Sequence, residues 1–257
     1  MKLLSKSLFM ALCMFGATLN AIAEEEATPP NLANMWVVHV KANMAGEFEA
    51  AFKEHIAFRE EQGDPNSWKV FTVAVGSDLS TYSIRSCCHD WADFDSYEAW
   101  EAEAGTGTHW NANVDQFINS YEHYFSAIDF ENSNWPEAGT EVNLVGVTYW
   151  NVKPGATAGM NAAKAKMSTL AKDHGWPRNW SWASPIGGGG GLVLVSPFAT
   201  YADMQAPEQN FADFLTEHMG SEEAAIELLN GFSSSASDSN YTIYRYRKDL
   251  SSPSDEE

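Results

Sequence analysis

A short pattern occurs twice in this chain and sets the strongest constraint on its fold. Residues 63–68 read Gly-x-Pro-x-x-Trp, and residues 175–180 repeat that pattern 112 positions later. At the same offset, residues 40–68 align with residues 152–180 without a gap, and seven of these 29 positions hold the same residue. Ordinary composition gives roughly two such matches. The repetition therefore predicts two similar units of about 100 residues each.

Both units predict the same order of elements: strand, helix, strand, strand, helix, strand. Trp36, Val38 and Val40 alternate as in a strand, whereas Phe48, Phe52 and the residues after them follow helical spacing. In the first unit we expect strands at 35–41, 68–75, 81–88 and 124–130, and helices at 46–62, 95–101 and 110–121. In the second we expect strands at 143–152, 180–186, 192–196 and 241–247, and helices at 157–174 and 211–229. Asp95 and Glu98 have capping-box spacing, and Gly220 predicts a break in the last helix.

The domain organisation follows from these elements and from the composition of the segments between them. We expect a signal peptide at 1–23, a leader at 24–34, a first unit at 35–131, a linker at 132–141, a second unit at 142–250 and a disordered tail at 251–257. The linker contains Trp-Pro and Glu-Ala-Gly, and a Ser-rich loop is expected at 233–239.

The first 23 residues have the three parts of a secretory signal peptide. Lys2 and Lys6 precede an apolar run from Leu8 to Leu19, and Ala21-Ile22-Ala23 forms a cleavage site. A lipoprotein site is the alternative, but the residues before the only cysteine in this segment are not the small ones that such a site needs. The sequence therefore predicts a periplasmic or secreted protein with no membrane span after cleavage.

The charge of the chain excludes several classes of partner. Its formal net charge is −20, which becomes −22 when the two lysines of the signal peptide are removed. A surface of this sign repels phosphate backbones and anionic lipids, so neither nucleic acid nor membrane is an expected partner. The seven histidines and the carboxylates lack the spacing of a metal site, so no metal is predicted.

The mature chain keeps two cysteines, Cys87 and Cys88, which are adjacent. Neighbouring side chains on a strand point to opposite faces, so a shared metal is not expected. Two readings stay open: a pair of buried, inert thiols, or a vicinal disulfide with thiol chemistry. In either case the fold must rest on hydrophobic cores, because adjacent cysteines cannot connect distant segments.

Three residues are candidates because the two copies differ at a polar position. His39 corresponds to Asn151, and both lie on the face of the first strand opposite its apolar residues. This pair either orients a ligand or makes a hydrogen bond between the two sheets. His55 lies on the apolar face of the first helix, where the second unit has Met167. His55 is either a functional acid, base or hydrogen-bond donor, or a core residue with a satisfied nitrogen.

Aromatic and basic residues on the second and third strands of each unit supply the remaining candidates. Trp68, Trp180 and Trp182 would line a cavity for a flat apolar ligand, or else fill the cores. Arg85, one of only 15 cations in the chain, would anchor a carboxylate or else pair with a surface acid. The glycine run 187–191 lacks the Lys-Ser/Thr of a phosphate loop and predicts a flexible hairpin.

The order of elements, with Val-Lys-Pro-Gly at 152–155 before a helix, resembles the dimeric α+β barrel superfamily. Its members include NIPSNAP-like proteins, antibiotic-biosynthesis monooxygenases, EthD-like proteins, haem-degrading enzymes and chlorite dismutases. The resemblance implies an α+β fold in which two tandem ferredoxin-like units pair their antiparallel sheets into one barrel. It also implies a ligand pocket between the first helix and the sheet, beside His55, and leaves oligomers open.

The resemblance gives two hypotheses about function. The first is an exported barrel protein that binds a small apolar or aromatic molecule as a cofactor-independent monooxygenase-like enzyme, with His55 and His39 as catalytic candidates. The alternative is a non-catalytic, NIPSNAP-like protein that carries a ligand or interacts with a partner. No cofactor is predicted. Haem is an alternative by resemblance to the haem-degrading members, and its site would use Asn151, Trp180 or Trp182, and His218.

Overall fold

The computed structural model describes residues 29–188 and 191–253. The predicted signal peptide and residues 24–28 of the leader lie outside these residues, as do two glycines of the 187–191 run and the last four residues of the tail. No helix within the described ranges is long and apolar enough to cross a membrane.

The first unit follows the predicted order of elements, with three α-helices as expected and a 3₁₀ turn in addition. Its strands are β1 (Leu32–Val40), β2 (Lys69–Val75), β3 (Thr81–His89) and β4 (Ile118–Asn134). Its helices are α1 (Ala45–Glu61), α2 (Trp91–Ala104), α3 (Thr106–Asn113) and a 3₁₀ turn, η1 (Asp115–Phe117). Gly105, with φ of +70°, lies at the junction of α2 and α3, where a residue with a side chain would be strained.

The second unit repeats this arrangement. Its strands are β5 (Leu144–Val152), β6 (Trp180–Ile186), β7 (Leu192–Phe198) and β8 (Ala236–Tyr246). Its helices are α4 (Thr157–Asp173), α5 (Phe211–Met219) and α6 (Glu222–Ser234), with 3₁₀ turns η2 (Ala202–Met204) and η3 (Lys248–Leu250). The predicted break at Gly220 is confirmed, since this residue has φ of +66° and separates α5 from α6.

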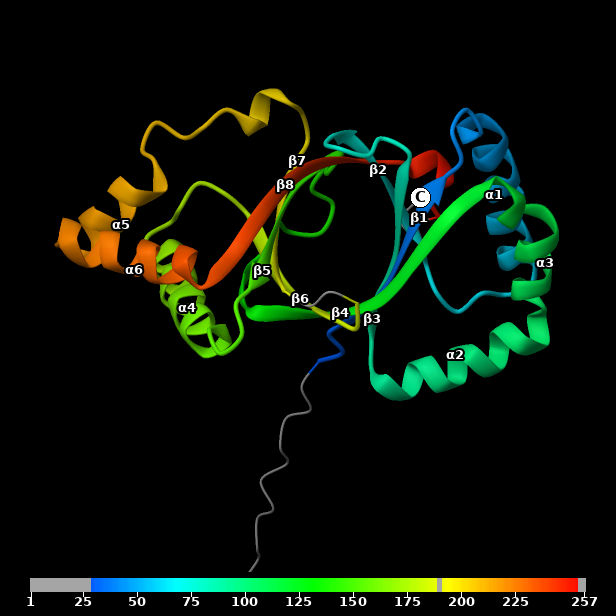
Figure 1. The fold of residues 1–257 in the computed structure, drawn as a ribbon, viewed down its shortest axis with the longest axis horizontal. Helices are drawn as coiled ribbons and strands as arrows, with labels where there is room; N and C mark the ends of the chain where they lie inside the picture. Colours follow the sequence, from blue (N-terminus) through cyan, green and yellow to red (C-terminus); the bar gives the residue numbers. More distant parts are fainter. Residues whose placement is uncertain (1–28, 189–190, 254–257) are drawn as a thin grey trace, which may run out of the picture.

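The eight strands form a closed antiparallel barrel in the order β1-β3-β2-β8-β5-β7-β6-β4. Each unit contributes four adjacent strands, and the long strands β4 and β8 close the ring by pairing with β6 and β2 of the other unit. Helices α1–α3 and α4–α6 cover the outside of the barrel on opposite sides (Figure 1). The predicted fold class, two ferredoxin-like units with their sheets joined into one α+β barrel, is confirmed.

The offset of 112 residues also describes equivalent contacts in the two units. The Lys41 N–H donates to the carbonyl of Phe117 at 2.9 Å, and the Lys153 N–H donates to that of Ser235 at 2.9 Å. Their ammonium groups repeat the match, with Lys41 Nζ 2.8 Å from the Gln116 carbonyl and Lys153 Nζ 2.8 Å from the Ser234 carbonyl. The matched residues of the sequence therefore hold matched places in the fold.

Two hydrophobic cores lie between the strands and the helices outside the barrel. The core of the first unit is centred on fully buried Phe48, Phe52 and Val70, and that of the second on Met160 and Leu215. Outward residues of the strands fill these cores, and alternate residues face the inside of the barrel. This division places the helix-facing and barrel-facing candidates in separate environments.

Several local predictions are wrong. Tyr121, expected at the end of a helix, lies on β4, and the expected Ser-rich loop at 233–239 is the end of α6 and the start of β8. The capping interaction of α2 is not at Asp95, because the Asp93 carboxylate accepts from the Asp90 N–H at 2.7 Å and the helix begins at Trp91. Strand pairing outweighs local propensity at Tyr121 and at the start of β8.

The segment that the sequence assigns to the tail begins with residues that contact the first unit. Ser251 Oγ accepts from the Val70 N–H at 2.9 Å, and Ser252 Oγ accepts from the Trp68 N–H at 3.0 Å. These contacts fix the start of the segment against β2.

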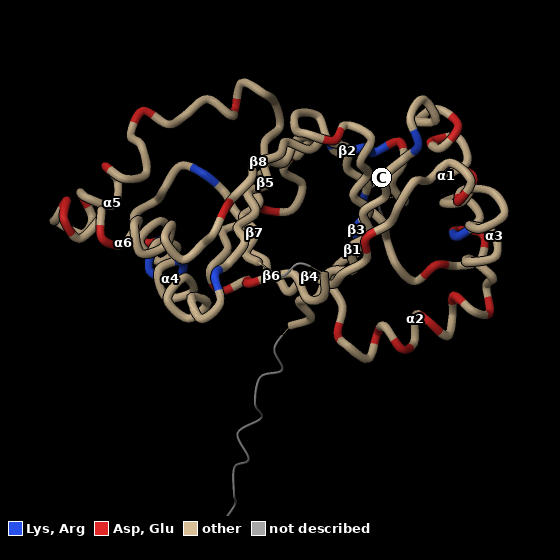
Figure 2. Tube along the Cα trace, viewed as in Figure 1, with Lys and Arg blue, Asp and Glu red and all other residues tan. Residues whose placement is uncertain are grey.

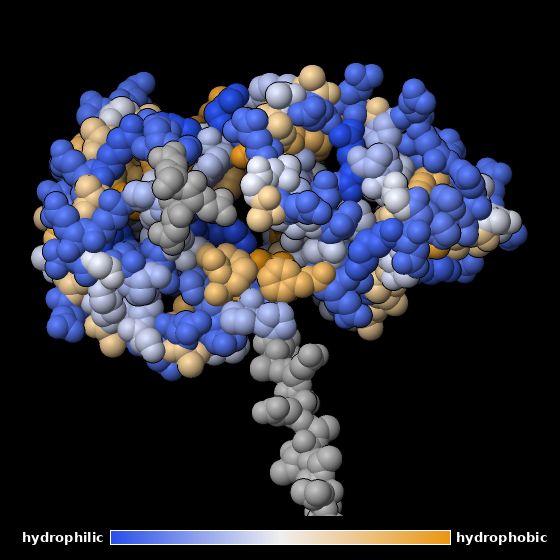
Figure 3. Space-filling view, turned by 180° about the vertical axis from the view of Figure 1, so that it is seen from behind, coloured by the Kyte–Doolittle hydropathy of each residue, from blue (hydrophilic) through white to orange (hydrophobic). Residues whose placement is uncertain are grey.

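The charge of the chain is spread unevenly over its elements. Helix α2 carries acidic side chains along its length and no basic ones (Figure 2). Seen from behind, most of the surface is hydrophilic (Figure 3). The acidic helix matters for the site, since α2 supplies one of its walls.

Candidate functional site

A cavity of about 830 Å³ lies between the helices of the first unit and the outer face of its sheet. We call it the first-unit cavity. Strands β1 and β4 contribute Asn34, Trp36, Tyr121 and His123 to one wall. Helices α1 and α2 contribute the opposite wall, which includes His55, Phe52, Arg59, Tyr97 and Glu101. Its volume is within the range of sites for small organic molecules.

Aromatic rings give the cavity a flat wall. The rings of Trp36 and His123 stack with centroids 4.0 Å apart and an interplanar angle of 12°. Phe125 lies next to His123 and contacts Phe94 of α2 at 4.3 Å between centroids. Trp36 is 36% exposed although it lies beside a core, because its ring borders the open space. This wall offers a planar surface on which an aromatic ligand would stack.

His55 on α1 and His109 on α3 form a hydrogen-bonded pair on the helix side of the site. Their Nδ1 atoms lie 3.0 Å apart, and His55 Nε2 lies 3.4 Å from Nη1 of Arg59. Burial, the Arg59 charge and His109 lower the pKa of His55 to about 3. The His55 imidazole is therefore neutral at ordinary pH, and its two nitrogens are directed at protein groups.

Arg59 links α1 to α2 through a buried network. Its guanidinium donates to Asp64 Oδ2 at 2.6 Å, to Glu101 Oε1 at 3.0 Å and to the hydroxyl of Tyr97. The same group lies 5.4 Å from the centre of the Trp68 ring. A guanidinium with two carboxylates is satisfied, so Arg59 shapes the wall and does not act as a free anion site.

His123 lines the cavity and has one ring nitrogen free to accept a proton. Its Nε2 lies 2.9 Å from Oδ1 of Asn34, and that amide oxygen can only accept, so Nε2 carries the proton. Burial lowers the pKa of His123. The ring is therefore neutral at physiological pH, with Nδ1 as its acceptor.

Acidic groups border the same space. Tyr121 donates its hydroxyl proton to Asp115, and Trp110 Nε1 donates to the Tyr121 oxygen at 2.9 Å. Burial, followed by the hydrogen bond to Asp115, raises the pKa of Tyr121 to about 12. With Glu98 and Glu101 on α2, these groups give the cavity an acidic border.

Among the described residues, the second unit does not repeat the polar His55 and Arg59 of α1. Met167 stands where the first unit has His55, and Ala171 stands where it has Arg59. Both belong to a core that also contains Met160, Trp182 and Phe232. Apolar core side chains thus stand at the places where the first unit has two polar residues of its cavity wall.

The structure brings some predicted site residues together and separates others. His55 and Trp68 both line the first-unit cavity, and Trp68 Nε1 donates to Asp64 at 3.1 Å. Trp180 and Trp182 lie in the second core, where their indole N–H groups donate to the Asn132 carbonyl at 2.7 Å and to Ser168 Oγ at 3.0 Å. Trp180 and Trp182 are therefore placed as core side chains.

His39 and Asn151 face the inside of the barrel, away from the first-unit cavity. His39 Nδ1 lies 2.9 Å from Asp78 Oδ2, and its Nε2 lies 3.4 Å from Glu122 Oε1. Asn151 donates to Asp238 Oδ1 at 2.6 Å. These are contacts with the adjoining hairpin and strands of the same sheet, so the expected hydrogen bond between the two sheets is not what the pair makes.

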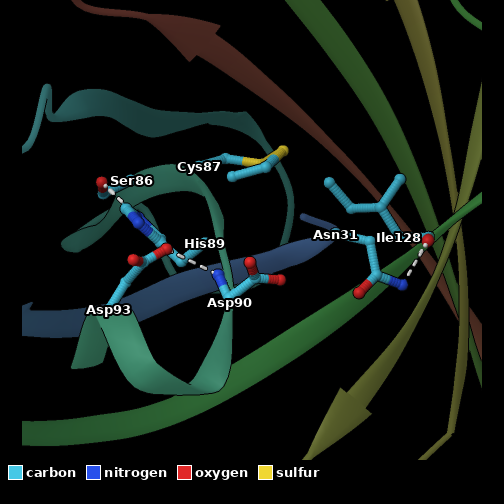
Figure 4. The surroundings of a disulfide bond; sticks show 8 residues. Asn31, Ser86, Cys87, His89, Asp90, Asp93 and Ile128 are labelled. Carbon is cyan, nitrogen blue, oxygen red and sulfur yellow. Dashed lines mark hydrogen bonds between the residues drawn. A yellow bond between two sulfur atoms is a disulfide. The ribbon is translucent and has the colours of Figure 1, made fainter. Parts of the chain in front are cut away.

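Cys87 and Cys88 form a disulfide with each other at the end of β3 (Figure 4). Cys87 is half-buried and Cys88 exposed, so the reading of two buried thiols is wrong. His89 follows directly, is buried, and lies 2.8 Å from Ser86 Oγ through its Nε2. The disulfide thus lies just before the connection between β3 and α2.

Three functional candidates were missed by sequence reasoning: Arg59, Trp36 and His123. Arg59 could have been found, because the second unit has an alanine at the equivalent place. His123 could not, since the segment around it was divided between a helix and a later strand. The pairing of β4 with β1 alone brings His123 over Trp36.

Comparison with protein families gives no match, and no curated protein is similar in sequence. Solved structures do match. A proposed monooxygenase from Fusobacterium nucleatum superposes with a TM-score of 0.55 at 10% identity, over 84% of this chain and 92% of its own. The chain has the dimeric α+β barrel fold. The fold that the resemblance implied from the element order is thereby confirmed.

Other dimeric α+β barrel proteins match as well. An anthrone oxidase-like protein gives a TM-score of 0.53 at 10% identity, over 85% of this chain and 92% of its own. A mutant chlorite dismutase from Candidatus Nitrospira defluvii gives 0.53 at 8% identity, over 86% and 92%. At these identities the likeness establishes the fold alone.

The residues considered for haem do not fit that group. Asn151 faces the inside of the barrel, Trp182 lies in the second core, and His218 stacks on His174 at 4.1 Å. They do not converge on one space, so no step through haem is derived. Within the described ranges, no group of three His, Cys, Asp or Glu side chains is placed to hold a metal ion.

Proposed function

We propose that the first-unit cavity binds a small, flat, mostly apolar aromatic molecule. The observation that carries this proposal is the stacked pair of Trp36 and His123, which borders a space of about 830 Å³. Because apolar core residues stand at the matching places of the second unit, one such site per chain is expected. The acidic border formed by Glu98, Glu101 and Asp115 favours neutral ligands over anions.

The reaction we propose is oxidation of this ligand by O₂ without a cofactor. In a balanced form, an activated methylene beside an aromatic ring becomes a carbonyl: R₂CH₂ + O₂ gives R₂CO + H₂O, with all electrons supplied by the substrate. His123 Nδ1 would accept the first proton, because Asn34 holds the other nitrogen. Fold neighbours that are described as a monooxygenase and as anthrone oxidase-like support this class of reaction.

His55 has a different part in this proposal. A general base works best when its pKa is near the working pH, and a pKa of about 3 makes His55 a weak one. We assign it to holding the helix wall through His109 and to excluding water. His39 lies on the barrel side and has no part in the reaction proposed here.

A second candidate function is ligand carriage without chemistry. It is favoured by the hydrogen-bonded pair of His55 and His109, because Nδ1 of His55, which lines the cavity, is engaged by another protein group. For either function we propose export to the periplasm or the exterior, on the basis of the signal-peptide pattern of residues 1–23.

Anthrone is a suitable probe, because it carries a methylene between two aromatic rings. We expect anthrone to quench tryptophan fluorescence on binding and to consume one O₂ for each anthraquinone formed. Trp36→Ala should lose both signals, whereas His123→Gln should keep binding and lose at least about tenfold in rate. Binding without O₂ uptake would establish the carrier function, and no binding would refute both candidates.

A further inference from the structure

The inside of the barrel contains space that the two hydrophobic cores do not use. On β1 the side chains of Val38 and Val40 point to the helices, so Val37 points inward. Inward-facing Phe71, Val147, Val193 and Val195 come from three other strands. All five are partly exposed although the ring of strands is closed. Water therefore reaches the interior, which we call the lumen; eight-stranded barrels are wide enough to hold one small ligand.

Arg85 faces this lumen from β3. Its neighbours Ile84 and Ser86 are buried on the helix side, and its partners across the strands are Met35 and Lys69. Burial alone lowers the pKa of Arg85. The side chain is nonetheless partly exposed. Arg85 therefore lies deep in the molecule, next to space that water can reach.

The Arg85 guanidinium has no protein partner among the described residues. The other four arginines each contact a carboxylate, a carbonyl or an aromatic ring: Arg59, Arg178, Arg245 and Arg247. A desolvated cation without a partner is costly, so it is normally paired or bound to a ligand. The chain has a net charge of −20, so its many carboxylates could have supplied a partner, yet none of those in the described ranges pairs with Arg85.

Charges of opposite sign lie toward the two ends of the lumen. Lys69, opposite Arg85 on β2, adds a second cation at this level. The acids that face the lumen lie further along the strands: Glu122 beside His39, and Asp238 beside Asn151. A bound anion would therefore be drawn toward Arg85 and repelled from the other end, with the valines between them.

We propose that the lumen is a second binding site, separate from the first-unit cavity, for a small amphiphilic carboxylate. The carboxylate accepts from the Arg85 guanidinium, whose fork of N–H groups matches two oxygens, and Lys69 adds attraction. The apolar part lies along the inward valines of both units. This inference does not depend on the function proposed for the first-unit cavity.

Isothermal titration calorimetry with decanoate tests the site, and decanol of equal chain length is the neutral comparison. We expect decanoate to bind the intact protein, decanol to bind at least about tenfold more weakly, and Arg85→Met to lose at least about tenfold for decanoate. Arg245→Met is the matched control, because Arg245 is exposed and contacts Tyr201. It should leave binding unchanged.

Two further variants complete the test. Trp36→Ala changes the first-unit cavity and should leave decanoate binding intact, so a loss there would move the site to that cavity and overturn the proposal. Arg85→Lys keeps the charge without the fork and should show intermediate affinity, which decides the matter if Arg85→Met does not fold. Equal affinity of intact protein, Arg85→Met and Arg85→Lys, or no binding at all, would also overturn it.

Discussion

The Nδ1 atoms of His55 and His109 lie 3.0 Å apart, so one ring must donate a proton that the other accepts. Protonation of both rings would place two N–H groups against each other. The nearby guanidinium of Arg59 adds to this restriction. The pair therefore stabilises the wall of the first-unit cavity only while at least one ring is neutral. Burial and the Arg59 charge keep the proton off His55, so the wall is sensitive to acid.

Stability should fall with pH because of His55. Its pKa is about 3 in the folded protein against 6.5 for an unperturbed histidine. Above pH 6.5 the ring is neutral in both states, so stability is complete. Below it, the unfolded chain binds a proton that the folded protein does not, and each pH unit costs up to about 1.4 kcal/mol. Urea unfolding should show a loss of about 2 kcal/mol from this group between pH 6.5 and about 5.

His55→Met, which copies the residue at the matching place of the second unit, isolates this contribution. The variant should show a flatter dependence of unfolding free energy on pH than the intact protein. His174→Gln serves as control, since His174 is exposed at the end of α4. Parallel pH curves for the intact protein and His55→Met would show that His55 is not the group responsible.

Removing Arg59 should destabilise the first unit strongly. Arg59→Met leaves the carboxylate of Asp64, whose side chain is 5% exposed, without its cation. Loss of one partner of a buried pair costs about 3 kcal/mol or more. Chemical denaturation measures this loss directly, with a fall in unfolding free energy at constant slope.

The double variant Arg59→Met with Asp64→Asn provides the control. An asparagine oxygen can still accept from Trp68 Nε1 and the Tyr97 hydroxyl, which lie 3.1 Å and 3.2 Å from Asp64 Oδ2. Much of the lost stability should return, because no unpaired charge remains. If the double variant is as unstable as the sum of both changes, the ion pair is not the reason for the loss.

These contacts show what could be predicted from the sequence. The offset of 112 residues matched His55 with Met167 and Trp68 with Trp180, and the two units that it defined predicted the barrel. Differences between the copies then pointed to His55, and the same comparison would have found Arg59. His123 lay outside its reach, because the aligned copies end at Trp68 and β4 is long only through its pairing with strands of both units. Arg85 was a candidate from the sequence. That it faces the lumen without a partner among the described residues could not be predicted, because this depends on the closure of the barrel.

Trp36→Ala should weaken ligand binding at little cost in stability. The ring is already 36% exposed and its loss removes one face of the stacked wall. Titration with anthrone, followed through the remaining tryptophans, should show at least about tenfold weaker binding. Trp91→Ala is the matched control, because Trp91 is exposed on the same unit and does not line the cavity. Equal affinity of both variants would place the ligand elsewhere.

The two units should depend on each other through Lys164 and Asp129. Lys164 lies on α4 of the second unit and is nearly buried, and its Nζ is 2.6 Å from Oδ2 of Asp129 on β4 of the first. Lys164→Met removes the cation and leaves a partly buried carboxylate, so we expect a loss of about 2 kcal/mol in unfolding free energy. Phe52 stands at the matching place in the first unit, so this contact has no counterpart there.

The double variant Lys164→Met with Asp129→Asn tests whether the ion pair holds the units together. Asp129 also accepts from Asn132 Nδ2 at 2.9 Å, a contact that an asparagine oxygen can keep. Unfolding should remain a single transition in the double variant and recover most of the stability. In Lys164→Met alone, the second unit should lose protection from hydrogen exchange in α4 before the first unit does. Uniform loss of protection over both units would show instead that the pair contributes only to overall stability.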